Sequence, residues 1–179
     1  MKEHVERIKR ELVYEGSILD IYADTVQAPN GHIEKWDFVS HRKGAACVLP
    51  VLPDGRIILV RQYRPALDRE TLEVPAGCRD SVDEDMAICA ARELEEETGY
   101  HSNHIEKLLE LRTTVAFCNE RVDVYLATDL VAGHQSLDEM EDIDVEILTL
   151  EEACNMAYEG KLQDAKTVAA IMAYAARSK

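Results

Sequence analysis

The stretch Arg92-Glu93-Leu94-Glu95-Glu96-Glu97-Thr98-Gly99-Tyr100 decides the fold, and it closes a segment, 83–98, whose pattern predicts a helix. Ser81 and Glu84 have the spacing of a capping box at the start of this helix, and Gly99 is placed to stop it. At about 100° per residue, one narrow stripe of the helix faces the sheet that we expect behind it. This stripe consists of Ala87, Ala91, Leu94 and Thr98.

The glutamates of the same stretch gather in a second sector of the helix. Glu93, Glu96 and Glu97 are spaced i, i+3 and i+4, so each pair costs roughly 3 kcal/mol before screening at about 5–6 Å and an effective dielectric of about 20. They also lie near the C-terminal end of the helix, where the macrodipole disfavours negative charge. One interpretation is an exposed acidic surface. The other is a cation site, since oxygen ligands at this spacing suit Mg²⁺ or Mn²⁺.

The wider spacing favours the cation site. Gly77, Glu84 and the stretch 92–100 together resemble the Nudix box, in which a glycine and a glutamate precede R-E-U-x-E-E-x-G-U, with U aliphatic or aromatic. Every fixed position from Glu84 onward matches. Six residues separate Gly77 from Glu84, whereas the family usually has five. We expect the extra residue to bulge at 79–82, so that Asp83 competes with Glu84 for the first acidic role.

This resemblance implies both a fold and a chemistry. The implied fold is the α+β Nudix fold, with a mixed β-sheet sandwiched between helices (α/β/α). Glu93, Glu96 and Glu97 would be metal ligands, Glu96 would also be the catalytic box glutamate, and Arg92 would orient a carboxylate through a bidentate pair. A structural salt bridge is the alternative for Arg92, and the two roles are compatible.

The residues before the box resemble the ADP-ribose pyrophosphatase subfamily. The sequence Leu72-Glu73-Val74-Pro75-Ala76-Gly77 is similar to its L-E-x-P-A-G entry, which implies that the carbonyl of Ala76 is a metal ligand and that Glu73 binds substrate. The glycine lets the backbone approach closely. The R-Q-Y-R segment at 61–64 implies that Arg64 holds the diphosphate, the alternative being an exposed strand charge. Segments 150–153 and 164–167 also resemble the subfamily.

Two further positions bear on the substrate. Trp36 is the only tryptophan, and it lies where subfamily members carry an aromatic residue that stacks on adenine; a core position is the alternative. Glu120 lies where relatives carry a flexible P-G-F-x-D/N-E loop whose glutamate acts as catalytic base or metal ligand. Val115 and Ala116 replace the expected Pro-Gly, which leaves the mobility of this loop open.

The remaining pattern predicts the other elements. Residues 18–39 form two antiparallel strands around a turn at 29–31, and 47–52 with 57–60 form a second hairpin, buried on both faces, around 53–55. Further strands are expected at 70–77, 105–114, 122–127 and 145–150, and further helices at 150–158 and 164–177. The last helix has the core positions Val168, Ile171, Met172 and Ala175. We assign 1–42 to an N-terminal β-hairpin extension and 43–179 to the Nudix hydrolase domain.

Composition limits the partners and the location. The chain of 179 residues is 46% hydrophobic and 31% charged, and it has no apolar run of the roughly 18 residues that a membrane span requires. Its net charge of −15 argues against binding to nucleic acid. Five widely spaced cysteines and a charged N-terminus predict neither a disulfide framework nor a zinc site, and they favour a reducing cytoplasm.

The leading hypothesis is hydrolysis of ADP-ribose to AMP and ribose 5-phosphate, with Mg²⁺ as cofactor and Mn²⁺ as a substitute. Hydrolysis of another nucleoside-diphosphate sugar, such as GDP-mannose or ADP-glucose, stays open because the box recognises the diphosphate and not the sugar. A non-catalytic nucleotide sensor is the alternative from another class. The resemblance also implies that the N-terminal hairpin exchanges between the protomers of a homodimer, so that each active site is shared.

Overall fold

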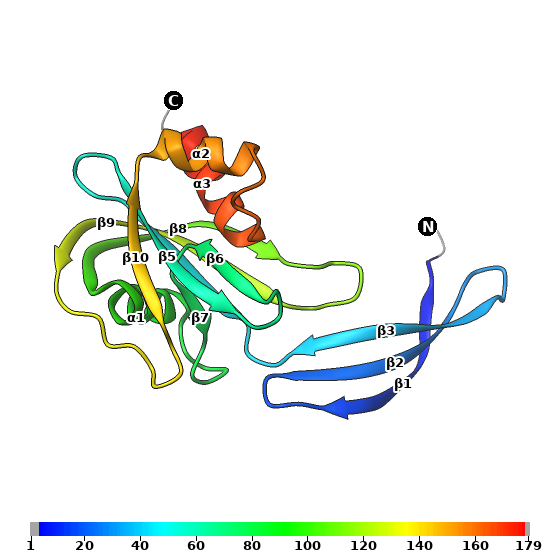
Figure 1. The fold of residues 1–179 in the computed structure, drawn as a ribbon. Helices are drawn as coiled ribbons and strands as arrows, with labels where there is room; N and C mark the ends of the chain where they lie inside the picture. The colour runs from blue at the N-terminus through cyan, green and yellow to red at the C-terminus, as the bar shows by residue number, and fades with distance from the viewer. Residues whose placement is uncertain (1–3, 178–179) are drawn as a thin grey trace.

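The computed structural model describes residues 4–177, which form ten strands and three helices (Figure 1). In chain order these are β1 (Glu6–Glu15), β2 (Leu19–Gln27), β3 (Ile33–His41), β4 (Ala45–Pro50), β5 (Ile57–Arg64), β6 (Arg69–Glu73), β7 (Ala76–Cys78), α1 (Met86–Thr98), β8 (Tyr100–Arg112), β9 (Arg121–Ala132), β10 (Ile143–Leu148), α2 (Leu150–Tyr158) and α3 (Ala165–Arg177). The expected α+β class is confirmed.

The main body is built on two sheets. One is mixed, with the order β7-β4-β9-β8, in which β4 and β9 are parallel and the other pairs are antiparallel. The other is antiparallel, with the order β10-β5-β6. Helix α1 packs on one side of β4, whereas α2 and α3 lie on the other side (Figure 1). The expected layers of helix, sheet and helix are therefore confirmed.

Strand β4 shows how the two cores arise from one sequence. Side chains alternate across a strand, so Ala46 and Val48 pack against α1 while Cys47 and Leu49 pack into the cluster that contains residues of α2 and α3. All four are fully buried. The expectation that this segment is buried on both faces is confirmed.

The turn after β4 also forms as expected, with Gly55 at φ 85°. However, the predicted hairpin is wrong beyond the turn. Strands β4 and β5 belong to different sheets, and a single bridge between Val51 and Ile57 joins their ends. Both segments are apolar on both faces, and a strand of that kind pairs with whichever neighbours bury it best.

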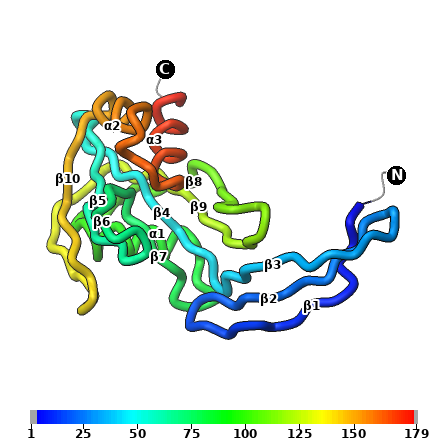
Figure 2. The backbone as a smooth tube through the Cα atoms, turned by 45° about the vertical axis from the view of Figure 1, so that its right-hand side comes forward, coloured from blue at the N-terminus to red at the C-terminus, as the bar shows by residue number. Residues whose placement is uncertain are grey.

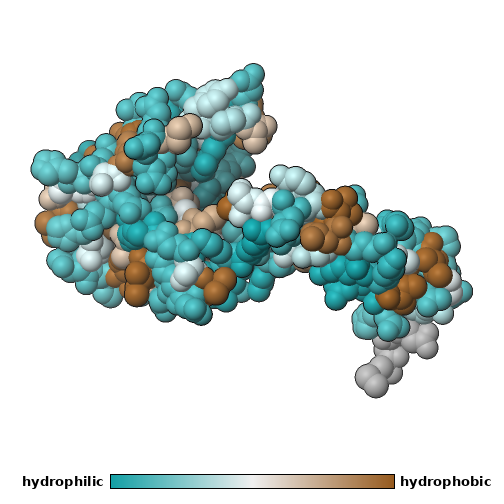
Figure 3. Space-filling model, turned by 90° about the horizontal axis from the view of Figure 1, so that it is seen from below, coloured by the Kyte–Doolittle hydropathy of each residue, from teal (hydrophilic) through white to brown (hydrophobic). Residues whose placement is uncertain are grey.

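The N-terminal extension is a three-stranded antiparallel sheet, β1-β2-β3, and not the two-stranded hairpin that the sequence predicts. The expected turn between β2 and β3 is present, with Gly31 at φ 86°. Strand β1 was missed because it is highly charged and lies against no core. The sheet projects from the main body (Figures 1 and 2), and hydrophobic patches lie along it (Figure 3). Its exposed large apolar side chains include Ile8, Leu12, Val13, Tyr14, Ile33 and Trp36.

Helix α1 differs from its predicted form at the N-terminus. It begins at Met86, and Asp85 caps it by accepting a hydrogen bond from the N–H of Ala87 at 2.7 Å, so the capping box at Ser81 is wrong. The side chain of Glu84 pairs with Arg92 and does not form the expected capping box with Ser81. Gly99 ends the helix in the left-handed conformation, at φ 72°, as expected.

The buried face of α1 is also turned relative to the expected stripe. Leu94 and Thr98 are buried, but Ala87 and Ala91 are only half-buried. Two of the box glutamates, Glu93 and Glu97, lie on the buried face instead. Apolar periodicity predicts only the apolar part of a buried helix face, so it does not predict that a carboxylate is buried there.

The single strand expected at 70–77 is wrong, because this segment forms two strands, β6 and β7, that belong to different sheets. The remaining elements match the expectations in kind and differ in their ends. In α3, Ile171 is buried as expected and Val168 packs against the core, whereas Met172 and Ala175 are only half-buried. Within 4–177 no helix is long and apolar enough to cross a membrane. The five cysteines are free thiols.

Candidate active site

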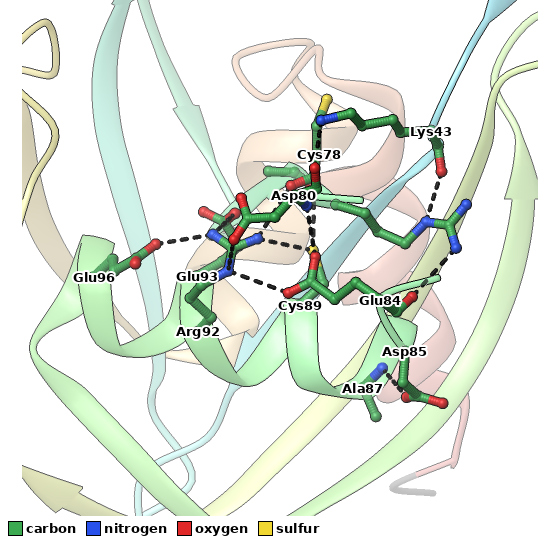
Figure 4. A network of polar contacts seen from close by, with 12 residues as sticks. Lys43, Cys78, Asp80, Glu84, Asp85, Ala87, Cys89, Arg92, Glu93 and Glu96 are labelled. Carbon is green, nitrogen blue, oxygen red and sulfur yellow. Dashed lines mark hydrogen bonds and ion pairs between the residues drawn. The ribbon is translucent and has the colours of Figure 1, made fainter. Parts of the chain in front are cut away.

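Arg92 lies at the centre of a polar network between α1 and the loop that precedes it (Figure 4). It donates from Nη1 to Glu93 Oε1 at 2.7 Å and to Glu96 Oε2 at 3.0 Å, and from Nε to Glu84 Oε1 at 3.4 Å. Arg92 therefore hydrogen-bonds three carboxylates singly, with Asp80 Oδ2 a fourth carboxylate at 3.7 Å from Nε, and does not hold one carboxylate in the expected bidentate pair. Although burial lowers the pKa of Arg92, these carboxylates raise it above its ordinary value.

Hydrogen bonds hold the loop with the extra residue in place, both within the loop and to the segment before β4. Glu84 accepts a hydrogen bond from the N–H of Asp80 at 2.7 Å, and Arg79 donates to the carbonyl of Lys43 at 2.6 Å. The side chain of Glu84 is mostly buried beside Arg92, whereas Asp83 is exposed. The position next to Arg92 therefore belongs to Glu84, and Asp83 does not compete for it.

Glu93 and Glu97 are buried carboxylates beside the strand β7. Burial raises the pKa of Glu97 to about 8, and the repulsion from Glu93 adds to it. Burial also raises the pKa of Glu93 to about 7, against the attraction of Arg92. Glu97 Oε2 accepts the backbone N–H of Ala76 at 3.1 Å. Two carboxylates are thus held where their negative charge lacks full compensation from the protein.

Gly77 is required here by a close approach. A Cβ on this residue would lie 2.1 Å from Glu93 Oε1 and 2.4 Å from Glu93 Cδ. The expectation that this glycine lets the backbone come close to the site is confirmed. The neighbouring Ala76 is thereby placed against the carboxylate end of α1.

The expected metal ligands meet at this end of α1, but they do not form a closed cluster. Within residues 4–177, no three His, Cys, Asp or Glu side chains are grouped so as to hold a metal ion. Arg92 engages Glu93 and Glu96, and Ala76 engages Glu97. The donor set nevertheless fits a hard divalent cation, because its ligands are carboxylate oxygens and two of them are buried with raised pKa values.

Arg64 and Glu73 form a bidentate pair across β5 and β6. The guanidinium donates to the two carboxylate oxygens at 2.7 and 2.8 Å, and Lys166 Nζ donates to Glu73 Oε2 at 2.5 Å. Although burial raises the pKa of Glu73, these two cations lower it to about 2. Lys166 was not predicted as a site residue. The only signal for it in the sequence was the segment 164–167, to which no role was given.

Glu120 lies at the end of the loop between β8 and β9. Its Oε2 accepts a hydrogen bond from Thr113 Oγ1 at 2.7 Å. A cleft of about 650 Å³ brings Glu120 together with Arg64, Ala76 and Lys166, which come from four separate parts of the chain. Three of these four were expected at the site from the sequence.

Trp36 lies outside this cleft, on β3. It lines an adjoining cavity of about 590 Å³ together with Phe117, and both Phe117 and Val39 also line the main cleft. The tryptophan side chain is half exposed, at 49%, so the alternative of a core position is wrong.

The fold and the site define a class of protein. It is an α+β sandwich in which the R-E-x-x-E-E segment of α1 packs against the glycine-containing strand β7. A family model described as the NUDIX domain matches residues 40–171. The chain belongs to the Nudix family of hydrolases.

Individual relatives are similar along most of the chain. An ADP-ribose pyrophosphatase of Bacillus subtilis (strain 168) is 39% identical, and a methanol dehydrogenase activator of Bacillus methanolicus is 37% identical; each match covers 92% of this chain and 89% of the relative. A GDP-mannose pyrophosphatase of Cronobacter sakazakii is 29% identical, and the match covers 94% of this chain and 93% of the relative. In structure, the chain matches an ADP compounds hydrolase with a TM-score of 0.82 at 21% identity, over 96% of this chain and 92% of the other.

Proposed function

We propose that this Nudix hydrolase cleaves the diphosphate of ADP-ribose and releases AMP and ribose 5-phosphate. The observation that carries the proposal is the cleft lined by Glu120, Arg64, Lys166 and Ala76. The backbone N–H of Ala76 donates to Glu97 of α1, so the box carboxylates lie directly behind this wall of the cleft. Two cations and one carboxylate suit an anionic diphosphate and an attacking water. The 39% identical relative named as an ADP-ribose pyrophosphatase supports this substrate.

The proposed cofactor is Mg²⁺, with Mn²⁺ as a substitute. Glu93, Glu96, Glu97 and the carbonyl of Ala76 would hold it, since oxygen donors are the ligands that these ions prefer. A bound divalent cation neutralises phosphate charge and makes water more acidic. Arg92 would orient Glu93 and Glu96, and its hydrogen bonds to both carboxylates support this role.

The protein's own groups supply the remaining chemistry. Glu120 would accept the proton of the water whose oxygen attacks one phosphorus, while the bond from that phosphorus to the bridging oxygen breaks. Glu96, the more exposed box glutamate, is the alternative base. Arg64 and Lys166 would hold the diphosphate oxygens. Both oxygens of Glu73 are already engaged, so we propose that Glu73 serves the substrate by holding these two cations in place.

The adenine would lie in the adjoining cavity and stack on Trp36. Its half-exposed indole and the neighbouring Phe117 offer aromatic surface, and the two cavities share residues.

We further propose a homodimer through the N-terminal extension, assigned above to residues 1–42. The extension exposes apolar side chains along a projecting sheet, which is the kind of surface that a second copy covers. Sedimentation at micromolar concentration tests this proposal. A monomer with full activity would rule out a shared site. The five free thiols are compatible with the proposed cytoplasmic location.

Two other functions have a specific observation behind them. The relative named as a GDP-mannose pyrophosphatase favours a different nucleotide sugar, and the relative named as a methanol dehydrogenase activator favours action on a partner enzyme. The deciding experiment is incubation with Mg²⁺ and a panel of ADP-ribose, GDP-mannose, ADP-glucose, diadenosine polyphosphates and NADH, with chromatography of the products. We expect AMP from ADP-ribose at the highest kcat/KM. Absence of AMP there would overturn the proposed substrate.

A further inference from the structure

His41 ends the strand β3 and lies buried next to Glu120. Its side chain is 5% exposed, and its Nε2 lies 3.8 Å from Glu120 Oε1. The same nitrogen lies 3.7 Å from Cys78 Sγ. His41 therefore lies beside one carboxylate oxygen of Glu120, and Thr113 bonds the other.

A backbone hydrogen bond fixes which ring nitrogen of His41 carries the proton. The N–H of Gly44 donates to Nδ1 at 2.9 Å, so Nδ1 presents its lone pair. The proton of the neutral ring is then on Nε2, and it points toward Glu120 and Cys78. The imidazole is thus a fixed donor aimed at a carboxylate.

The loop that carries Glu120 is attached to the same strand. The N–H of Val39 donates to the carbonyl of Phe117 at 2.7 Å, and the N–H of His41 donates to Asn119 Oδ1 at 2.7 Å. Strand β3 therefore sets the position of the loop backbone, and the ring of His41 lies next to the side chain of Glu120, which follows Asn119 in the loop. These bonds anchor the loop at Phe117 and Asn119, just after the positions 115–116 where Pro-Gly was expected.

We propose that His41 is a positioning residue for Glu120, acting through its Nε2–H. This inference rests on the proposed role of Glu120 as the base. Thr113 Oγ1 donates to Oε2 at 2.7 Å, and His41 Nε2 lies 3.8 Å from Oε1, so each oxygen of the carboxylate has a potential donor beside it where Glu120 lines the cleft. A ring N–H beside Oε1 steers the orientation of the Glu120 carboxylate in the cleft that both residues line.

Two substitutions separate the donor from the rest of the ring. His41→Gln places an amide N–H where Nε2 lies, whereas His41→Asn keeps an acceptor for Gly44 at the place of Nδ1 and loses the donor toward Glu120. With ADP-ribose and Mg²⁺, we expect His41→Asn to lower kcat on the order of 10-fold with little change in KM. His41→Gln should stay within about 3-fold of the unchanged protein. If Asn is as active as Gln, the ring is merely structural and the proposal is overturned.

A second pair of measurements keeps the inference independent of folding and of the proposed base. Nitrogen-15 NMR of the unchanged protein should show His41 as the Nε2–H tautomer, and the Nδ1–H tautomer would overturn the proposal. In a Glu120→Gln background, His41→Asn should cost no further activity, because the two residues act as a unit. If Glu120→Gln alone leaves kcat unchanged, the proposed base fails, whatever His41 does.

Discussion

A Cβ on residue 77 would lie 2.1 Å from Glu93 Oε1, so the Glu93 carboxylate packs against the backbone of Gly77 and leaves no room for a side chain there. The clash would fall on the far end of a side chain that Arg92 holds at 2.7 Å. The position of the Glu93 carboxylate therefore requires a residue without a side chain at position 77.

Gly77→Ala should remain folded and lose activity. The glutamate can move aside at modest cost, but its carboxylate then leaves the site, so we expect kcat to fall on the order of 100-fold. The measurement is turnover of ADP-ribose together with thermal unfolding. The double variant with Glu93→Ala should be no less active than Glu93→Ala alone. A further loss in the double variant would mean that Gly77 acts independently of Glu93.

Glu97→Gln should reduce turnover on the order of 100-fold, while Glu95→Gln, on the exposed side of the same helix, should have little effect. The reason is that Glu97 is a buried box carboxylate and Glu95 faces solvent. Steady-state kinetics with ADP-ribose is the measurement. A nucleotide sensor would keep its binding response in both variants, and equal activity of the two variants would count against an enzyme that uses Glu97.

Stability without added metal should fall as the pH rises through the range set by Glu93 and Glu97. Their folded pKa values, about 7 and about 8, lie above the ordinary 4.5, so the folded state binds the extra protons. The stabilisation is complete below pH 4.5 and is lost by about pH 8. Unfolding midpoints with EDTA and with Mg²⁺ test this, and the gain from Mg²⁺ should grow with pH. Glu97→Gln should flatten the dependence, whereas a gain that does not change with pH would contradict it.

Glu73→Gln should destabilise the fold by roughly 2–3 kcal/mol, less than a fully buried pair because the Arg64 side chain is 39% exposed. Urea unfolding at pH 7 is the measurement, and Glu70→Gln, on the same strand and exposed, is the matched control. The folded pKa of Glu73 is about 2, below the ordinary 4.5. Its contribution is therefore present above pH 4.5 and lost as the pH falls toward 2, so the two proteins should converge in acid. A difference that persists at pH 2 would point to another cause.

Trp36 should report nucleotide binding directly, because it is the only tryptophan in the chain. If adenine stacks on it, AMP should quench the intrinsic fluorescence, while ribose 5-phosphate should not. Trp36→Phe should keep most of the affinity, and Trp36→Ala should raise KM more than it lowers kcat. Unchanged fluorescence at saturating AMP would place the adenine elsewhere.

The sequence by itself determined the family and the fold class, and it predicted most of the residues that the structure brings together at the candidate site. Local patterns suffice for these: the glutamate spacing on one helix, the stop at Gly99 and the glycine before the box are all read within a few residues. The turns at Gly31 and Gly55 were also predicted, since positive φ angles favour glycine locally.

Only the tertiary structure decided how these pieces meet. Whether β4 pairs with β5 or with β9 depends on partners distant in the chain. Glu97 is buried because a sheet lies behind the helix. The contacts of Glu73 with Arg64 and Lys166 join residues more than eight positions apart in the sequence. The contact of His41 with Glu120 does so as well. No local pattern encodes such contacts, because the free energy that fixes them comes from packing and desolvation of the whole assembly.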